Sequence, residues 1–418
     1  MKKFNLLFML ALAALLYSCS NVEEQELVEL SDEPSKEQEI PGKYIVVFQD
    51  DYIASGRMSE PIFTDRAAKI AYTARKSGES LAKMESFLST NKIGAEKVSH
   101  RYTSAIAGFA AELTDKEVER LKADPNVLSV EPDREVFMQE FWVESVETAE
   151  EAAAKNVVAR QTPCAVSNAG GVGNGSGSNT WVWVVDSGID LDHPDLNVVT
   201  NTSYARSFVG GSANDCNGHG THVAGIAGAI SNSIGISGVS AGVPVVPIRV
   251  FGCSGGSSSS TIIAGIDHVA ANDISGDVMN LSLGGFYGSG CSSGSAYRSA
   301  VNRVANGGTH VAIAAGNSSA NANLYQPACL NGSRIYTVAS MTCGQSFSSF
   351  SNFGVGPIDW IATGSSVYST YLNGGYATLS GTSMASPVVA GILHQRNGAP
   401  RQCGTVTRSG VTYRVACR

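Results

Sequence analysis

The chain lacks the features that suggest a nucleic-acid-binding or membrane-spanning protein. Only 16% of its 418 residues are charged, and its net charge is -8. Such a chain has no basic stripe that could neutralise a phosphate backbone, so nucleic acid is not expected as a partner. Its N-terminal apolar run, residues 4–17, is shorter than the roughly 20 residues that a membrane helix needs. The 43% hydrophobic content indicates a well-packed globular protein instead.

The usual zinc and thiol-redox motifs are also missing. The sequence has no CxxC pair and no HExxH motif, which argues against a zinc ribbon, a redox dithiol and a zinc protease. Beyond Cys19 an even number of cysteines remains, which in an exported chain favours disulfides whose pairing the sequence cannot assign. These cysteines are Cys164, Cys216, Cys253, Cys291, Cys329, Cys343, Cys403 and Cys417.

The N-terminus has the arrangement of a secretory signal. Two lysines precede the apolar run, and Ser18 and Cys19 follow it. The stretch from Leu16 to Cys19 also resembles the lipobox of bacterial lipoproteins, whose cysteine is acylated. We therefore expect residues 1–18 to be a lipoprotein-type signal and Cys19 to be lipidated, with a plain cleaved signal as the alternative. The rest of the chain is then extracytoplasmic.

Residues 20–160 predict a tether, a small module and a linker. Residues 20–40 are acidic with almost no aromatics, which is typical of a solvated tether. Within residues 41–138, apolar patterns predict strands and helices, including a capping box at Thr114 and Glu117, in an order that suits a ferredoxin-like α+β sandwich. The expected strands are 43–48, 105–113 and 127–131, and the expected helices are 65–88 and the segment after Thr114. Residues 139–160 are acidic and partly alanine-rich and predict a linker with a frayed helix.

Residues 161–418 predict an α/β domain. After a glycine- and serine-rich loop, short apolar runs alternate with helical patterns, which argues for a mostly parallel sheet covered on both faces. The expected strands are 181–185, 243–250, 277–283 and 310–315, and the expected helices are 221–230, 261–271 and 296–305.

Three motifs in this domain carry candidate chemistry, and each has an ordinary structural explanation. Asp186 ends an apolar strand, where open α/β sheets collect ligands, although such an aspartate is often a turn or N-cap residue. His219 lies between two glycines that let a helix start approach a neighbouring strand; with His222 it could instead be a metal pair, but no third ligand shows the usual spacing. Ser383 lies at the start of a helix, where serine is usually an N-cap, and Pro387 follows at a position where its missing N–H costs little.

The three motifs together, in the order Asp, His, Ser, resemble the subtilisin-like serine peptidases, in particular the proteinase K and aqualysin branch. The resemblance covers residues 161 to about 391. The motifs that carry it are His219 to Gly225, Asn280 to Gly285, Ala314 to Asn317 and Gly381 to Pro387. Residues 41–138 are similar to the inhibitory propeptides of this family, notably at Gly108 to Ala111 and Val127 to Asp133. The implied fold is a subtilisin-like three-layer α/β domain after a small α+β prodomain.

This resemblance implies roles for individual residues. His219 is expected to take the proton of Ser383 and return it to the leaving amine, while Asp186 orients the imidazole. Asn317 and the Ser383 N–H are expected to bind the oxyanion. Substrate is expected to pair as a strand with two walls, and small residues leave room for a large apolar side chain before the scissile bond. The predicted substrate-binding residues are Ser254, Gly255, Gly256, Ser282, Leu283, Gly284, Gly285, Ala315 and Gly316.

The chain departs from the family pattern in several places. Val388 stands where histidine is usual, and the expected C-terminal helices are replaced by residues 401–418, for which we expect a hairpin joined by Cys403 and Cys417. The family also implies a Cys216–Cys253 bridge. Asp359 falls near a family calcium ligand, although an ordinary surface-loop carboxylate is equally compatible. No cofactor is expected for catalysis and no metal in the active site, whereas structural calcium is compatible with the family.

These observations predict an exported serine endopeptidase that is made as an autoprocessed precursor. Its partners would be polypeptide substrates, its own prodomain as inhibitor and, before processing, a bacterial membrane through Cys19, and the protein is expected to be a monomer. Cleavage between residues 138 and 160 would release a soluble mature enzyme, either secreted or at the cell surface. The alternative function is a catalytically silent subtilisin-like binding scaffold, for which the loss of a triad residue would be the usual sign, and none is lost.

Overall fold

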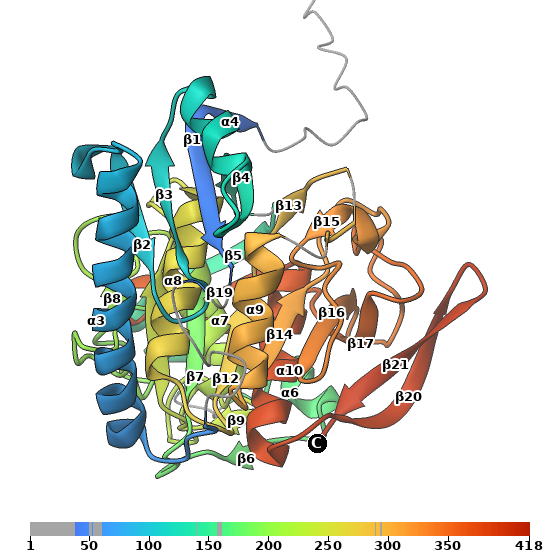
Figure 1. Ribbon diagram of the computed structural model, residues 1–418. Helices are drawn as coiled ribbons and strands as arrows, with labels where there is room; N and C mark the ends of the chain where they lie inside the picture. Colours follow the sequence, from blue (N-terminus) through green and yellow to red (C-terminus); the bar gives the residue numbers. More distant parts are fainter. Residues whose placement is uncertain are drawn as a thin grey trace, which may run out of the picture. The chain divides into compact units, whose positions relative to one another are not determined.

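The computed structural model describes residues 38–49, 52, 61–138, 140–156, 161–288, 290–292 and 295–418 (Figure 1). The predicted signal, Cys19 and most of the predicted tether lie outside these residues. Residues 36–418 belong to one structural unit. Among the described helices, none combines the length and the hydropathy that crossing a bilayer requires.

An antiparallel sheet with the order β4-β1-β3-β2 forms the N-terminal module. Val46, Phe48 and Phe109 from its strands share a core with Phe87 from the helix at residues 66–90. The elements are β1 (Glu39–Phe48), α3 (Arg66–Thr90), β2 (Val98–Tyr102), β3 (Gly108–Glu112), α4 (Asp115–Lys122) and β4 (Val127–Phe137). The α+β module is therefore present, with a capping box at Thr114 and Glu117 as expected. The sequence patterns missed β2, and β1 already starts inside the predicted tether.

The larger domain is built on a sheet with the order β20-β21-β17-β16-β14-β12-β7-β10-β8. The pairs from β8 to β21 are parallel, and only the terminal β20–β21 pair is antiparallel. The strands are β7 (Val182–Asp186), β8 (Arg206–Ser207), β10 (Val245–Arg249), β12 (Val278–Leu281), β14 (His310–Ala314), β16 (Ile335–Met341), β17 (Ile358–Thr363), β20 (Arg401–Arg408) and β21 (Val411–Cys417).

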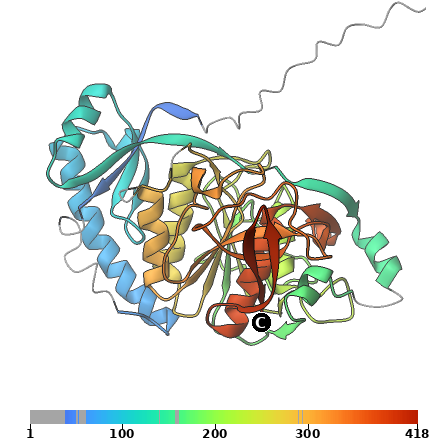
Figure 2. The same ribbon diagram turned by 90° about the vertical axis from the view of Figure 1, so that its right-hand side faces the viewer.

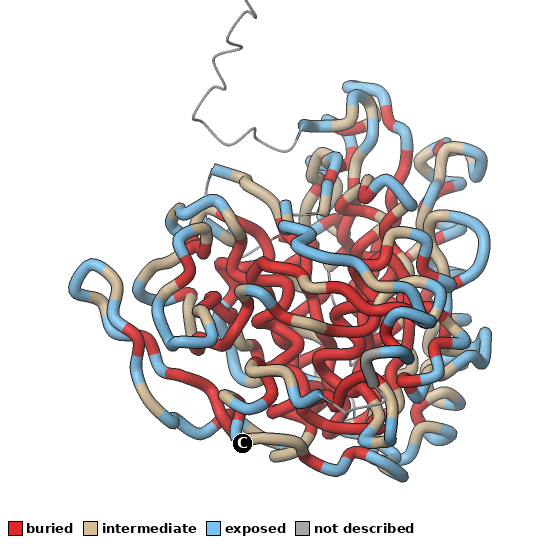
Figure 3. Tube along the Cα trace, turned by 180° about the vertical axis from the view of Figure 1, so that it is seen from behind, coloured by how far each residue is buried: buried red, intermediate tan, exposed pale blue. Residues whose placement is uncertain are grey.

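Helices cover both faces of this sheet. Val182 and Val184 pack in one core with residues of α7 (His219–Gly228) and α10 (Thr382–Arg396). The alternate residues Trp183 and Val185 pack in a second core with α8 (Ser259–Asn272) and α9 (Ala296–Asn306). Successive side chains of a strand point to opposite faces, so a strand between two helix layers must be apolar throughout. Figure 3 shows the resulting concentration of buried chain in the sheet and these helices.

The last residues form the hairpin predicted in place of C-terminal helices. Strands β20 and β21 pair antiparallel, and Ile361 of β17 pairs with Val415 of β21, so the hairpin extends the central sheet. Four disulfides join Cys164–Cys343, Cys216–Cys253, Cys291–Cys329 and Cys403–Cys417. The pairings expected for Cys216–Cys253 and Cys403–Cys417 are confirmed, and the other two resolve what the sequence left open.

The predicted linker differs from its expected form. Its first part is the strand β5 (Trp142–Glu147), which pairs antiparallel with β19 (Tyr376–Ser380), and only its alanine-rich part forms a helix, α5 (Ala149–Asn156). Strand β18 (Val367–Thr370) completes this sheet. Figure 2 shows α5 on the opposite side of the described chain from α3. The remaining elements are short: α6 (Cys164–Asn168), β6 (Gly173–Asn174), β9 (Ser240–Ala241), β11 (Gly256–Ser258), β13 (Gly285–Phe286) and β15 (Tyr325–Gln326).

Candidate active site

Asp186 and His219 meet at the carboxyl end of β7. The Nδ1 atom of His219 lies 2.8 Å from Oδ1 of Asp186, and both side chains are buried. His219 is the first residue of α7, and its N-cap Gly218 has a φ of 100°, a conformation that favours glycine. On the other side, a Cβ at Gly220 would collide with the carbonyl of Gly188. Glycines on both sides therefore allow the close approach of helix and strand that the sequence predicted.

Ser383 is the second residue of α10, and its hydroxyl donates to the carbonyl of Ser282 at 3.3 Å. Among the described residues, no hydrogen bond joins this hydroxyl to His219, whose Nε2 has no partner. The imidazole instead faces the ring of Phe141, with centroids 4.8 Å apart. Hydroxyl rotamers change readily, and catalytic hydrogen bonds are often long before substrate is bound.

Pro387 differs from its expected role. It is the sixth residue of α10 and lies beyond the first turn, so its missing N–H leaves the carbonyl of Ser383 without its helical donor. The hydroxyl of Ser282 donates to that carbonyl at 2.8 Å and takes over the missing bond. The proline is tolerated because the neighbouring loop supplies this donor.

Asn317 is held by the start of the same helix. Its Oδ1 accepts from the N–H of Thr382 at 2.8 Å and from the Thr382 hydroxyl at 2.7 Å. This arrangement directs the amide nitrogen outward, and Nδ2 donates to the carbonyl of Glu140 at 2.7 Å. A side-chain amide held in this way can stabilise a developing oxyanion.

The two predicted substrate walls have different surroundings. Gly256 of β11 pairs with Phe137 of β4, and Met138 N–H donates to the carbonyl of Gly255 at 2.9 Å, so the first wall already holds an antiparallel strand. Ser254 and Gly255 line the same pocket as Phe137. Among the described residues, no main-chain bond joins β4 to the second wall. That wall consists of Ser282, Leu283, Gly284 and Gly285, with Gly285 paired to Gln326, and of Ala315 and Gly316, whose carbonyls accept from Asn352.

Two protein-family models match the chain, the subtilase family over residues 177–399 and the peptidase inhibitor I9 family over residues 43–139. An extracellular serine proteinase of Thermus sp. (strain Rt41A) is 34% identical over 84% of this chain and 79% of that protein. The chain belongs to the subtilase family. Proteinase R of Parengyodontium album is 33% identical over 76% of each protein, and alkaline serine exoprotease A of Vibrio alginolyticus is 34% identical over 84% of this chain and 60% of that protein.

Family membership confirms the predicted fold class and enzyme class. The protein is a subtilisin-like serine endopeptidase with an inhibitor I9 propeptide. Subtilases need no cofactor for catalysis. Within the described residues no three His, Cys, Asp or Glu side chains are grouped as a metal site. Asp359 lies in strand β17 and not in a loop; its Oδ2 accepts from the N–H of Thr337 at 2.9 Å, and burial raises its pKa to about 6.

Sequence reasoning missed the residues that position His219 in this subtilase. Asp215 accepts hydrogen bonds from the N–H groups of Gly218 and Thr221, both at 3.0 Å, and therefore caps α7. It also accepts from the hydroxyl of Ser187 at 2.9 Å, and that hydroxyl accepts from the N–H of Gly220 at 3.0 Å. Asp215 lies four residues before His219 in the sequence, and Ser187 adjoins Asp186, so an aspartate just before the predicted helix was a signal that could have found this cap.

The other histidines of the catalytic domain are buried or partly buried, and burial lowers their pKa values. The carbonyl of Val367 and the carbonyl of Ala377 each lie 3.0 Å from Nε2 of His222. Burial lowers the pKa of this imidazole to about 3. A neutral, buried His222 fits the expected core role and not a metal pair. His394 bonds to the hydroxyl of Ser240 at 2.7 Å. His193, His268 and His310 are also buried or partly buried, and burial lowers their pKa values.

Carboxylates fasten the propeptide to the catalytic domain of the subtilase. Glu131 accepts from the N–H of Ala296 at 2.9 Å, at the start of α9, and Asp133 accepts from the N–H of Ser260 at 2.9 Å, at the start of α8. Helix N-termini favour such negative charge. In the opposite direction, Asp267 of α8 accepts from the consecutive propeptide N–H groups of residues 103–105 at 3.1, 2.8 and 2.6 Å.

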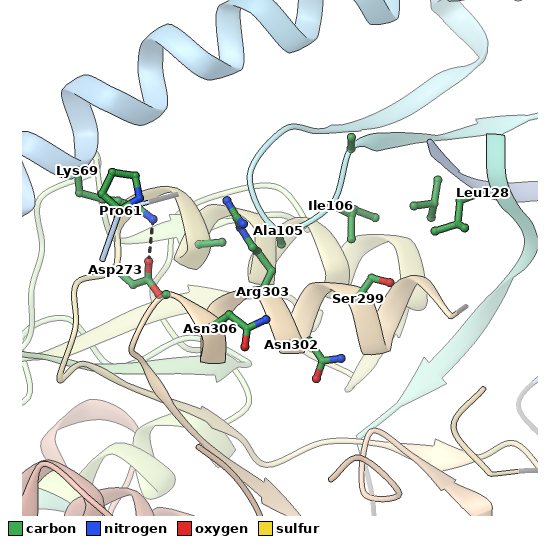
Figure 4. A pocket seen from close by; sticks show the side chains of 14 residues that line it. Pro61, Lys69, Ala105, Ile106, Leu128, Asp273, Ser299, Asn302, Arg303 and Asn306 are labelled. Carbon is green, nitrogen blue, oxygen red and sulfur yellow. Dashed lines mark ion pairs between the residues drawn. The ribbon is translucent and has the colours of Figure 1, made fainter. Parts of the chain in front are cut away.

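Helix α3 of the propeptide adds two ion pairs. Both terminal nitrogens of Arg66 contact the carboxylate of Asp277, at 2.9 and 3.0 Å, and its guanidinium lies over the ring of Trp181. Lys69 faces Asp273 at 3.5 Å beside a pocket of about 300 Å³ (Figure 4). Burial raises the pKa of Asp273 to about 6 although Lys69 acts against it. None of Asp186, His219 and Ser383 lines this pocket, which belongs to the propeptide interface.

Proposed function

We propose that this subtilase hydrolyses peptide bonds through an acyl-enzyme formed on Ser383. His219 acts as general base and then as general acid, Asp186 fixes its orientation, and Asn317 with the Ser383 N–H stabilises the oxyanion. The observation that supports these roles best is the 2.7 Å bond from Asn317 to a peptide carbonyl, beside the His219–Asp186 pair. In our proposal the oxyanion of a bound substrate accepts the same bond from Asn317.

We further propose a preference for large apolar residues before the scissile bond of substrates. Gly284 and Gly316 carry no side chain into the second wall, and Ala315 carries only a methyl group. A peptide library in which only the residue before the scissile bond varies would measure this preference. Equal cleavage after lysine or arginine would refute it.

The proposed life cycle begins with an exported precursor. Its relatives include an extracellular serine proteinase, which supports export. In our proposal the precursor is lipid-anchored through Cys19, the chain cleaves off its own propeptide, and the anchor leaves with that fragment. The mature subtilase is then soluble and monomeric. Acyl chains found on a mature chain that still contains Ser383 would contradict this order.

Two measurements on the full-length chain test the catalytic proposal. A fluorophosphonate probe should label wild-type mature enzyme on Ser383, and Ser383→Ala should remain an unlabelled, uncleaved precursor. Loss of this nucleophile should lower kcat by on the order of 10⁶-fold. An unlabelled wild-type protein that binds peptides without cleaving them would favour the binding-scaffold alternative. Structural calcium is a separate proposal, which melting temperatures with and without a chelator would test.

A further inference from the structure

The chain passes through its own active site. On one side, β4 is paired with β11 up to Phe137 and Gly256, and the next bond runs from the N–H of Met138 to the carbonyl of Gly255. On the other side, β5 begins at Trp142, which pairs with Ser380, next to the helix that carries Ser383. Glu140 and Phe141, which lie between these two paired strands in the sequence, contact Asn317 and His219.

Two contacts identify the residues at the crossing point. The carbonyl of Glu140 accepts the 2.7 Å bond from Asn317. The next residue, Phe141, lies with its ring 4.8 Å from that of His219, and its Cβ lies 3.6 Å from the position that a Cβ on Gly381 would take. The carbonyl of Glu140 is therefore at the proposed oxyanion site. The nitrogen bonded to this carbonyl belongs to Phe141, which lies beside His219, the proposed general base.

We propose that the Glu140–Phe141 peptide bond is the bond that this subtilase cleaves in itself. This inference rests on the proposed function and adds the site of processing, which the sequence restricted only to residues 138–160. Glutamate at this position departs from the apolar preference proposed for substrates. The difference has a structural cause, because the Glu140 side chain is exposed. Main-chain pairing of β4 and β5 sets the cleaved bond, not recognition of the side chain.

The chemistry balances with the groups at hand and one water molecule. The Ser383 oxygen adds to the carbonyl carbon of Glu140, and its proton passes to Nε2 of His219, which has no hydrogen-bond partner among the described residues. The bond between the Glu140 carbon and the Phe141 nitrogen breaks, and His219 gives the proton to that nitrogen. Water then hydrolyses the Glu140 ester, which leaves a carboxylate on Glu140 and restores Ser383.

The deciding experiment follows the full-length chain during maturation by mass spectrometry of both fragments. The earliest products should be a fragment that ends at Glu140 and one that begins at Phe141, formed at a rate independent of protein concentration. Earliest products with other termini, combined with an uncleaved Ser383→Ala chain, would overturn this inference and leave the proposed function intact. Cleavage of Ser383→Ala at the same bond would overturn the proposed function instead.

A matched pair of variants tests the position of the bond. Phe141→Pro removes the N–H of the leaving nitrogen and constrains the backbone beside His219, and it should slow this cleavage by on the order of 10²-fold. Phe141→Ala loses the same ring but keeps the N–H, and it should still be cut after Glu140. Glu140→Gln should also be cut there, because this side chain is exposed. Unchanged processing of Phe141→Pro, or a shifted bond in Glu140→Gln, would overturn the inference.

Discussion

The hydroxyl of Ser282 donates to the carbonyl of Ser383, the group that Pro387 leaves without a helical donor. In return, the hydroxyl of Ser383 donates to the carbonyl of Ser282. These reciprocal bonds join the second predicted substrate wall to Ser383, the proposed nucleophile. A buried carbonyl without a partner is costly, so the wall and the proline in the helix depend on each other.

Ser282→Ala should therefore destabilise the uncleaved precursor. The loss in free energy of unfolding should be about 1–3 kcal/mol, the usual cost of an unsatisfied buried polar group. Denaturant unfolding in the Ser383→Ala background would measure it without self-digestion.

Adding Pro387→Ala to Ser282→Ala supplies a new N–H to the same carbonyl, and the double variant should regain part of the loss. The two single substitutions and the double one form a thermodynamic cycle. Simple additivity of the two single effects would show that Ser282 and Pro387 are not coupled.

Asn317→Ala should reduce kcat by about 10²–10³-fold with little change in KM, because the amide binds the oxygen more strongly as charge develops on it. Self-cleavage should slow in the same proportion, since the same amide contacts Glu140. Steady-state kinetics on a chromogenic peptide and the rate of propeptide release would measure both. Asn323→Ala, at an exposed position of the 3-10 helix Ala322–Leu324, is a suitable control. A rise in KM at constant kcat would contradict the oxyanion role.

If the chain is cleaved after Glu140, as we propose, β5 becomes the N-terminal strand of the mature subtilase; in the uncleaved chain it pairs along β19. Glu144 accepts from the hydroxyls of Ser366 and Ser380, and Glu147 accepts from that of Tyr368 at 3.0 Å. We therefore predict that β5 competes with the part of a substrate beyond the scissile bond. Glu144→Ala should speed amide hydrogen exchange in residues 142–147 and lower KM for long peptides, but not for short chromogenic ones. Glu150→Ala in α5 makes the same charge change at an exposed site; an equal effect there would contradict the prediction.

The sequence predicted what depends on local pattern. The strand runs of the parallel sheet are apolar on both faces, and the predicted limits of β7 and β14 fall within one residue of the observed ones. The glycines around His219 and the capping box at Thr114 also act within a few residues of themselves. In these cases the chemistry that makes the structure is contained in the motif.

The sequence could not predict what depends on distant partners. Residues 142–147 form a strand only because β19, more than 200 positions away in the chain, offers its edge. The Cys164–Cys343 pairing likewise requires the finished fold. Pro387 was misjudged because the donor that replaces its N–H, the hydroxyl of Ser282, belongs to another loop.

Release of the propeptide should depend on pH through His100, whose Nε2 lies 3.4 Å from the Thr261 hydroxyl on α8. Burial lowers the pKa of His100 below its usual 6.5, with Lys43 acting in the same direction and Asp133 against it. The docked propeptide thus takes up this proton less readily than a free one, so the contribution of His100 to docking is complete above pH 6.5 and is lost as the pH falls towards the lowered pKa. Burial raises the pKa of Glu131, so protonation of this carboxyl favours docking, and its contribution to docking grows as the pH falls.

Size-exclusion chromatography of the processed complex between pH 7.5 and 5.5 should show that the wild-type propeptide is released as the pH falls. His100→Gln should release less propeptide than wild type, whereas Glu131→Gln should not reduce the release. Equal release by wild type and His100→Gln would rule out His100 as the group that senses pH.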